Sequence, residues 1–109
     1  MLYLVNFIAK PQFLYPTRME SIKSTYTEGD QFTLTCEAKG VPAPVVTWFK
    51  NDKILHGRNR AGVFIEAGKY DYIINFDGVD MTDGGNYTCM VSNMYGRLTY
   101  SYNFNVTGK

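Results

Sequence analysis

Apolar and polar residues alternate along several stretches of the chain with a period of two, which is typical of strands that bury one face. In residues 32–38 the buried face would contain Phe32, Leu34, Cys36 and Ala38. Residues 87–91 alternate in the same way, and in residues 70–76 the inward positions would be Tyr72, Ile74 and Phe76. In residues 97–106 they would be Leu98, Tyr100, Tyr102, Phe104 and Val106. No stretch has a sustained apolar stripe at helical spacing, so the pattern predicts an all-β protein.

Glycine, proline, asparagine and aspartate divide the chain into short strands joined by turns. We expect strands at residues 10–16, 18–26, 31–39, 45–50, 53–55, 63–66, 70–76, 86–93 and 97–106. Residues 40–44 should break a strand, and residues 56–62 should form an exposed loop. Val79 and Met81 are expected to be buried beneath the turn that carries Asp83.

Four residues at set separations identify the kind of sheet packing. Trp48 follows Cys36 by 12 residues and would lay its ring against the cysteines from the opposite sheet. Tyr87 precedes Cys89 by two residues, as a tyrosine corner requires. Together these positions predict an immunoglobulin-like β-sandwich with Greek-key connections. The gap between Trp48 and Tyr70 is too short for the two extra strands of a variable-type domain, which favours the intermediate type.

Several longer motifs extend this pattern, namely Gly40-x-Pro42-x-Pro44, Trp48-Phe49-Lys50-Asn51, Asp83-x-Gly85-x-Tyr87-x-Cys89 and Asn93-x-x-Gly96. With Cys36, they resemble the intermediate (I-set) immunoglobulin domains of cell-surface receptors, adhesion proteins and muscle proteins. We expect residues 10–107 to form one such domain, and residues 1–9 to be an N-terminal extension or an appended segment, with Met1 as the start of a fragment.

The I-set resemblance also implies structural roles for single residues. Asp83 would pair with a basic residue such as Arg60 across one end of the sandwich. The Tyr87 hydroxyl would bind the backbone near residues 79–81. The core around the cysteines would contain Phe32, Leu34, Trp48, Ile74 and Val91.

A narrower resemblance is carried by Arg18-Met19-Glu20, Gly85-Asn86-Tyr87-Thr88-Cys89, Asn93-x-Tyr95-Gly96 and Tyr102-x-Phe104-x-Val106. These runs are similar to the second immunoglobulin domain of fibroblast growth factor receptors, which binds growth factor and heparan sulfate. The resemblance implies that the ligand-facing positions, mostly apolar in that family, fall on Lys23, Thr25, Thr27 and Thr107. Its heparin-binding positions would fall partly on Arg18, Ser21, Thr33 and Thr35. Because only Arg18 is basic among these four, we expect at most weak binding of heparan sulfate.

Cys36 and Cys89 are the two cysteines of the chain, and both fall on inward-facing positions. This placement argues against a redox-active or metal-binding pair. A disulfide between them would stabilise the fold by about 4 kcal/mol in the chain-entropy model and would indicate an oxidising compartment. A reduced pair buried in the core is the alternative.

Length and charge limit the possible functions. The chain has 109 residues, enough for one domain, and its 11 basic and 10 acidic residues leave a net charge of +1. This balance favours neither nucleic-acid binding nor membrane binding, and the apolar residues 1–9 are too few to span a bilayer. The single histidine, His56, has no nucleophile pattern near it, and zinc-ligand spacings and phosphate-binding glycine loops are absent. We therefore predict a protein that is not an enzyme and uses no cofactor or metal.

The residues that face outward include candidates for glycosylation and for partner binding. Asn86-Tyr87-Thr88 and Asn105-Val106-Thr107 are N-glycosylation acceptors in a secreted chain, with both asparagines facing outward. A partner would meet the edge from Arg18 to Thr27 or the sheet face that contains Met90, Ser92, Thr99, Ser101, Asn103 and Asn105. The basic group Lys53, Arg58, Arg60 and Lys69 is a candidate site for an anionic glycan, with a solvated loop rim as the alternative.

These features favour a non-catalytic extracellular recognition module of a cell-surface receptor or adhesion protein. It would bind a protein ligand or neighbouring immunoglobulin domains through a sheet face or an edge strand. The alternative is a structural I-set module of a cytoplasmic, sarcomeric or cytoskeletal multidomain protein, with reduced cysteines and unmodified asparagines. The run Pro11-Gln12-Phe13-Leu14, common in muscle modules, favours that alternative. A third hypothesis, an enzyme accessory domain, has no residue in its favour.

Overall fold

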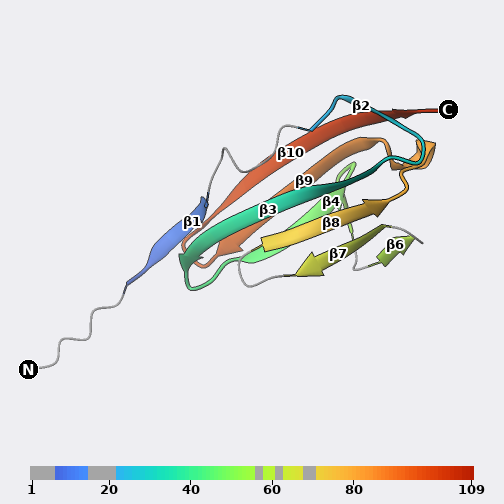
Figure 1. Cartoon of the computed structure of the whole chain (residues 1–109). Helices are drawn as coiled ribbons and strands as arrows, with labels where there is room; N and C mark the ends of the chain where they lie inside the picture. The colour runs from blue at the N-terminus through green and yellow to red at the C-terminus, as the bar shows by residue number, and fades with distance from the viewer. Residues whose placement is uncertain (1–6, 15–21, 56–57, 61–62, 68–70) are drawn as a thin grey trace, which may run out of the picture.

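The alternating stretches form strands in the computed structural model, which describes residues 7–14, 22–55, 58–60, 63–67 and 71–109 (Figure 1). Besides the strands, the described residues contain one short 3₁₀ helix, η1 (Met81–Asp83). The strands are β1 (Ala9–Phe13), β2 (Thr25–Thr27), β3 (Gln31–Val41), β4 (Val45–Lys50), β5 (Lys53–Ile54), β6 (Arg58–Arg60), β7 (Val63–Ala67), β8 (Asp71–Asp77), β9 (Gly85–Asn93) and β10 (Gly96–Thr107).

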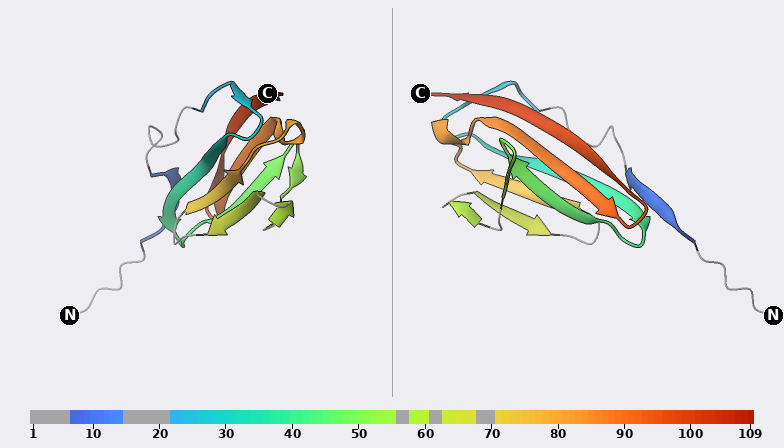
Figure 2. Two further views of the ribbon diagram at one scale, coloured as in Figure 1. Left: turned by 45° about the vertical axis from the view of Figure 1, so that its right-hand side comes forward. Right: turned by 180° about the vertical axis from the view of Figure 1, so that it is seen from behind.

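The strands make two five-stranded sheets, ordered β1-β3-β8-β7-β6 and β2-β10-β9-β4-β5. Figure 2 shows the sheets as two layers packed on each other. Neighbouring strands are antiparallel except β2, which runs parallel to β10. The chain therefore contributes its first strand, β1, to one sheet and its second, β2, to the other. The all-β immunoglobulin-like sandwich is thus confirmed.

A disulfide joins the two sheets near their centre. It links Cys36 of β3 to Cys89 of β9, with the two Cα atoms 6.4 Å apart. Trp48 of β4 is paired in register with Cys89, and its side chain is buried beside the bridge. On the facing sheet, Leu34 and Ile74 are register partners and are fully buried. The period-two pattern thus places the apolar residues of both sheets in one interior.

Aromatic side chains fill the interior toward the end where β10 finishes. The ring centroid of Phe104 lies between 5.1 and 5.7 Å from those of four other rings, which belong to Tyr26, Phe32, Phe76 and Tyr87. Tyr26 and Phe32 are stacked in turn, with their centroids 3.8 Å apart. These contacts attach β2, β3, β8 and β9 to the inner face of β10.

The tyrosine corner differs in detail from the expectation. The Tyr87 hydroxyl donates to the carbonyl oxygen of Asp83 at 2.6 Å, not to residues 79–81. Val79 is buried as expected, whereas Met81 is 61% exposed. The reason is η1, whose single turn directs Asp83 inward and leaves Met81 on the outside. Asp83 is buried, and its carboxylate accepts a hydrogen bond from the Asp80 N–H at 2.8 Å; the side chain of Arg60, its expected partner, lies outside the described residues.

One strand is longer than predicted, and another lies where a loop was predicted. β3 continues through Gly40 to Val41 instead of ending at residue 39. Gly40 allows β1 to approach closely, because a Cβ there would lie 3.3 Å from the Ala9 carbonyl oxygen. The segment 56–62, expected as a loop, contains β6, which pairs with β7. Because β6 pairs with β7, it belongs to the sheet that contains β3 and β8. The described part of the other sheet therefore ends at β5, as in an intermediate-type domain.

The described parts of the outer strands differ from the expectation, and one residue predicted to face inward is exposed. Within the expected stretches 10–16 and 18–26, the described strands are β1 and the three-residue β2. β2 pairs with β10 only at residues 105–107. Leu98 lies on β10 far from this pairing, and it is 38% exposed.

Among the described residues, no helix is long and apolar enough to cross a membrane.

Candidate protein-binding surface

The parallel pairing of β2 with β10 gathers the predicted ligand-facing residues. The Asn105 N–H donates to the Ser24 carbonyl at 2.9 Å, and the Glu28 N–H donates to the Thr107 carbonyl at 2.8 Å. Lys23, Thr25, Thr27 and Thr107 consequently lie around this short ladder, and all four are exposed. Arg18 and Ser21 lie outside the described residues.

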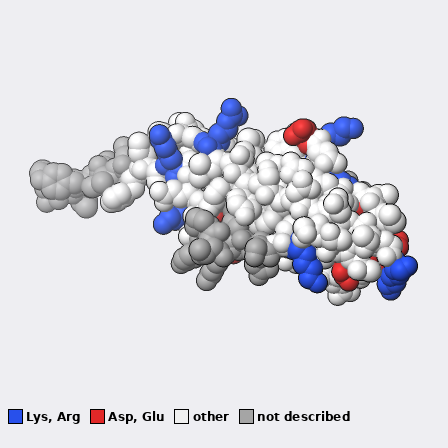
Figure 3. All heavy atoms as spheres, turned by 90° about the horizontal axis from the view of Figure 1, so that it is seen from above, with Lys and Arg blue, Asp and Glu red and all other residues white. Residues whose placement is uncertain are grey.

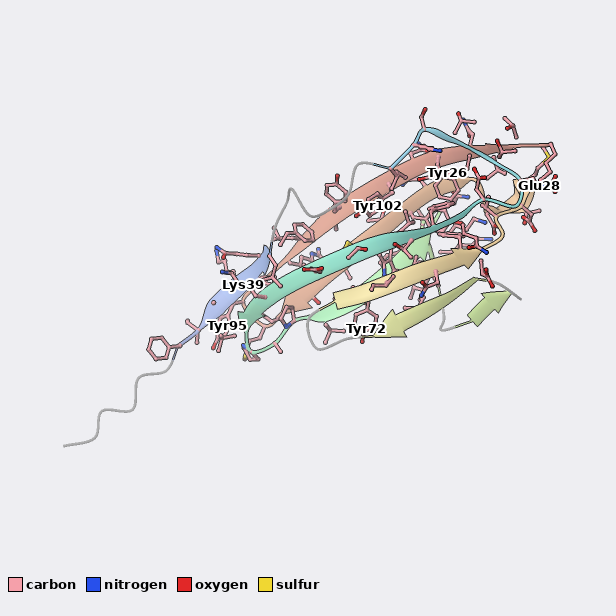
Figure 4. All side chains as sticks on the ribbon, in the orientation of Figure 1. Tyr26, Glu28, Lys39, Tyr72, Tyr95 and Tyr102 are labelled. Atoms are coloured by element: carbon pink, nitrogen blue, oxygen red, sulfur yellow. A yellow bond between two sulfur atoms is a disulfide. The ribbon has the colours of Figure 1, made fainter. Side chains whose placement is uncertain are left out.

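β2 is held in place by its inward side chain. Tyr26 is buried against Phe32 and Phe104, and its hydroxyl accepts a hydrogen bond from the Lys23 N–H at 3.1 Å. The Lys23 ammonium lies 5.9 Å from the centre of the Tyr26 ring. Figure 4 shows Tyr26 and Glu28 near the C-terminal end of β10, away from Lys39 and Tyr95. The predicted ligand-facing residues therefore occupy one end of the domain.

The outer edge of β2 is partly closed by Asp30. The Thr27 N–H donates to the Asp30 carboxylate at 2.9 Å, and the Thr27 carbonyl accepts from the Asp30 N–H at 2.9 Å. Both backbone groups of Thr27 that face away from β10 are thus occupied. Proteins protect edge strands in this way against pairing with other chains. Little of β2 is left for the addition of a partner strand.

Beside this edge, the sheet presents an outer face without charge. We call it the uncharged face, and define it by the outward side chains of three strands, Val45, Thr47, Phe49, Asn86, Thr88, Met90, Ser92, Thr99, Ser101, Asn103 and Asn105. Met90 lies near its middle, between Thr99 of β10 and Thr47 of β4. The Thr88 and Ser101 hydroxyls are hydrogen-bonded across the strands at 2.8 Å. The segments 45–49, 86–93 and 99–107 contain no Asp, Glu, Lys or Arg.

Charged residues surround the uncharged face instead of lying within it. Lys23 borders it beyond β2, Arg97 points outward at one end of it as the register partner of Ser92, and Lys50 and Lys53 lie beside the β4–β5 turn. Lys50 is held in place, because its ammonium donates to the Thr82 carbonyl at 2.6 Å and lies over the Tyr87 ring. Figure 3 views the domain from above, along the edge of the sandwich where β2 and β10 lie in Figure 1, and the charged side chains drawn there lie near the outline of the view.

Apart from Met90, the apolar part of this surface was not predicted. Val45 is 63% exposed at one end of β4, and Ile54 of β5 is 57% exposed beside Phe49, its register partner. The sequence signal was present, since Val46 and Trp48 face inward and the alternation turns Val45, Thr47 and Phe49 outward. The adjacency of these residues to Met90 follows only from the pairing of β4 with β9.

Both glycosylation candidates lie on the uncharged face. Asn86 of β9 is the register partner of Asn103, and Asn105 follows two positions later on the same side of β10. Asn86 is partly buried, whereas Asn105 is exposed. Both backbone groups of Asn86 are hydrogen-bonded to Asn51. The Asn51 N–H donates to the Asn86 carbonyl at 2.8 Å, and the Asn51 side-chain oxygen accepts from the Asn86 N–H at 3.0 Å.

The candidate anion-binding residues lie elsewhere or are not described. Thr33 and Thr35 are on β3, on the opposite sheet from the uncharged face, and neither is basic. Lys53 is exposed, and the side chains of Arg58, Arg60 and Lys69 lie outside the described residues, as does His56. Among the residues that the structure describes, no group of three His, Cys, Asp or Glu side chains could hold a metal ion.

Comparisons with known proteins agree with this architecture. Fibroblast growth factor receptor 1 of Xenopus laevis is 29% identical over 97 residues, which are 89% of this chain and 12% of that protein. Hemicentin-1 of Mus musculus is 34% identical over 82 residues, 75% of this chain and 1% of that protein. The chain thus spans a small part of these relatives.

The fold matches solved structures closely. The crystal structure of titin domains Z1Z2 in complex with telethonin superimposes with a TM-score of 0.80 at 24% identity, over 94% of this chain and 49% of that chain. The model of the family described as "Immunoglobulin domain" matches residues 10–93. The chain belongs to the immunoglobulin domain family.

Proposed function

We propose that the chain is a non-catalytic recognition module of an extracellular cell-surface or secreted protein, and that it binds a protein ligand through the uncharged face. The observation that carries the proposal is the composition of this face. Its centre contains Met90 and Phe49 and lacks charge, while Lys23, Lys53 and Arg97 lie around it. Protein interfaces have this arrangement, with methionine and aromatic residues enriched, charge depleted at the centre and a polar rim.

The face is better suited to binding than the edge of β2. Strand addition requires a row of backbone groups that are free to pair. Thr27 has both of its outward groups bonded to Asp30. Thr25, Thr107 and Lys23 then lie at the border of the face, outside its central contact area. Neighbouring immunoglobulin domains are a second class of protein that such a face would accept.

The relatives suggest a ligand class. The name of fibroblast growth factor receptor 1 describes a receptor for a protein growth factor, so a growth factor of this class is the first ligand to test. Heparan sulfate has less support, because Thr33 and Thr35 replace basic residues at two of the positions implied for it. We therefore propose a protein ligand as the principal partner and a sulfated glycan as a weak one at most.

The extracellular location rests on the Cys36–Cys89 pair and the two sequons. The bridge that joins β3 to β9 requires an oxidising compartment to persist. The alternative is a structural module of an intracellular muscle or cytoskeletal protein, which the likeness in fold to titin domains keeps open. Intact-mass analysis of this segment, isolated from the parent protein in its own tissue and alkylated without reduction, separates the two. Unalkylated cysteines support the extracellular module, whereas two alkylated thiols contradict it.

Ligand binding is tested with variants that charge one face at a time. The folded chain is immobilised and screened against fibroblast growth factors, purified immunoglobulin-domain proteins and heparan sulfate. Met90→Arg places a charge at the centre of the uncharged face, and Thr33→Arg places one on the opposite sheet as the matched control for protein ligands. Loss of binding in Met90→Arg alone supports the proposal. Equal binding by both variants would overturn it.

A further inference from the structure

Asn105 stands on a part of the uncharged face where the neighbouring side chains are small. Its register partner on β2 is Thr25, and Asn103 and Thr107 flank it along β10. On the other side lies Gly84, where a Cβ would be only 3.5 Å from the Asn105 Cα. The Asn105 side chain is exposed, while its N–H is already bonded to Ser24. A large group attached to the side-chain nitrogen would therefore leave the fold undisturbed.

Asn86 is in a more confined position on the same face. Besides its two backbone bonds to Asn51, its side-chain nitrogen lies 3.4 Å from the Thr88 hydroxyl oxygen. It is also partly buried. Of the two Asn-x-Thr acceptors, Asn105 thus has the more open surroundings.

We propose that Asn105 carries an N-linked glycan, and that this glycan covers the β2 end of the uncharged face. The proposal rests on the proposed extracellular function, because the Asn-x-Thr acceptor is used in secreted chains. The bond formed joins the Asn105 amide nitrogen to the first sugar of a lipid-linked oligosaccharide, the lipid pyrophosphate leaves, and the amide loses one proton.

The position of Asn105 determines which surface the glycan covers. It lies directly beside Ser24 and Thr25, so the attached sugars would extend over Lys23, Thr25 and Thr27. The middle of the face, with Met90 and Thr99, and its opposite end, with Val45, lie several residues away along β10 and β9 and stay open. The glycosylated domain would therefore bind its protein ligand through the open part of the face. The predicted ligand-facing residues on β2 would be available only in glycan-free protein.

The first experiment asks whether the site is occupied. Parent protein from its own tissue is alkylated without reduction, treated with peptide N-glycosidase in ¹⁸O-water and mapped by mass spectrometry. A bridged Cys36–Cys89 pair together with ¹⁸O-labelled aspartate at position 105 supports the proposal. A bridged pair with unmodified Asn105 overturns it and leaves the extracellular function standing. Alkylated thiols with unmodified asparagines overturn both.

The second experiment asks what the glycan covers. The full chain is secreted from cultured cells as wild type, Asn105→Gln, Asn86→Gln and Thr107→Ser, the last of which keeps an acceptor sequence. Acylation of Lys23 by a bulky ester reagent is expected to be several-fold faster in Asn105→Gln than in the three proteins that retain the Asn105 glycan. Lys39, exposed at the other end of the domain, serves as the internal control (Figure 4). Equal Lys23 rates in all four proteins would overturn the covering role.

Discussion

The two sheets share one interior, but their outer faces differ. The outer face of the β3–β8 sheet is polar and charged, and includes Glu37, Lys39 and Asp77, whose carboxylate accepts from the Gln31 side-chain amide at 2.8 Å. The uncharged face of the other sheet has Met90, Thr99 and Ser101 in its central part. Packing determines what faces inward on both sheets, and it leaves the outward positions free. The difference between the outer faces is therefore the stronger indication of where a partner binds.

The largest expected effect is a difference in stability between a change in the shared interior and a change on an outer face. Phe104→Ala removes a ring that contacts aromatic residues of four other strands. We expect it to lower the free energy of unfolding by about 3–5 kcal/mol, as for other buried Phe→Ala changes. The neighbouring Asn103→Ala, whose side chain faces outward, should stay within about 0.5 kcal/mol. Urea unfolding followed by Trp48 fluorescence measures both, and similar losses in the two variants would contradict the assigned orientation of β10.

The next effect tests the two outer faces against each other. Once a ligand is identified, Met90→Arg is expected to weaken its binding by about 2 kcal/mol, or roughly thirtyfold in Kd, because an unpaired charge must be desolvated at the interface. Thr33→Arg should leave the Kd of a protein ligand unchanged. Isothermal titration calorimetry measures the affinities, and unfolding curves show whether both variants are folded. A larger loss of affinity in Thr33→Arg would instead place the binding site on the β3–β8 sheet.

Two tyrosine hydroxyls allow a finer comparison within the interior. Tyr87 donates to the Asp83 carbonyl and Tyr102 donates across the sandwich to the Thr35 carbonyl, both at 2.6 Å. Tyr87→Phe should cost about 1.5 kcal/mol, since it leaves a buried carbonyl without this donor. Tyr102→Phe should cost about 1 kcal/mol, because its hydrogen bond is only partly buried. Urea unfolding of the two variants gives the costs, and a larger loss for Tyr102→Phe would reverse the expected order.

The interior was largely predictable from the sequence, and the corner and edges were not. Alternation correctly placed Leu34, Ile74 and Trp48 in the interior, because a buried sheet face requires an apolar residue at every second position. The same reasoning failed for Leu98, which is exposed near the start of β10, beside the turn that joins β9 to β10. It also failed for Met81, because one 3₁₀ turn changes which residues face inward and no period-two pattern describes such a turn.

The binding surface was predictable strand by strand but not as a whole. The outward positions of β9 and β10 follow from alternation, and Met90, Thr99 and Asn105 were recognised in this way. The contribution of Val45 depends on the pairing of β4 with β9, a contact between segments distant in the sequence. Likewise, the protection of β2 depends on the hydrogen bond from the Thr27 N–H to the Asp30 carboxylate, which is visible only in the folded turn.

The smallest expected effect distinguishes the uncharged face from the β2 edge. Asp30→Ala removes the acceptor of the Thr27 N–H and should lower the free energy of unfolding by about 1 kcal/mol. Ligand affinity should not change if binding uses the face, because Asp30 lies outside it. If binding used strand addition, freeing the Thr27 N–H would extend the available edge and tighten binding. Thr25→Ala is the matched control, since it changes an exposed side chain of the same strand and leaves its backbone intact. Tighter binding in Asp30→Ala with unchanged binding in Thr25→Ala would therefore move the site from the face to the edge.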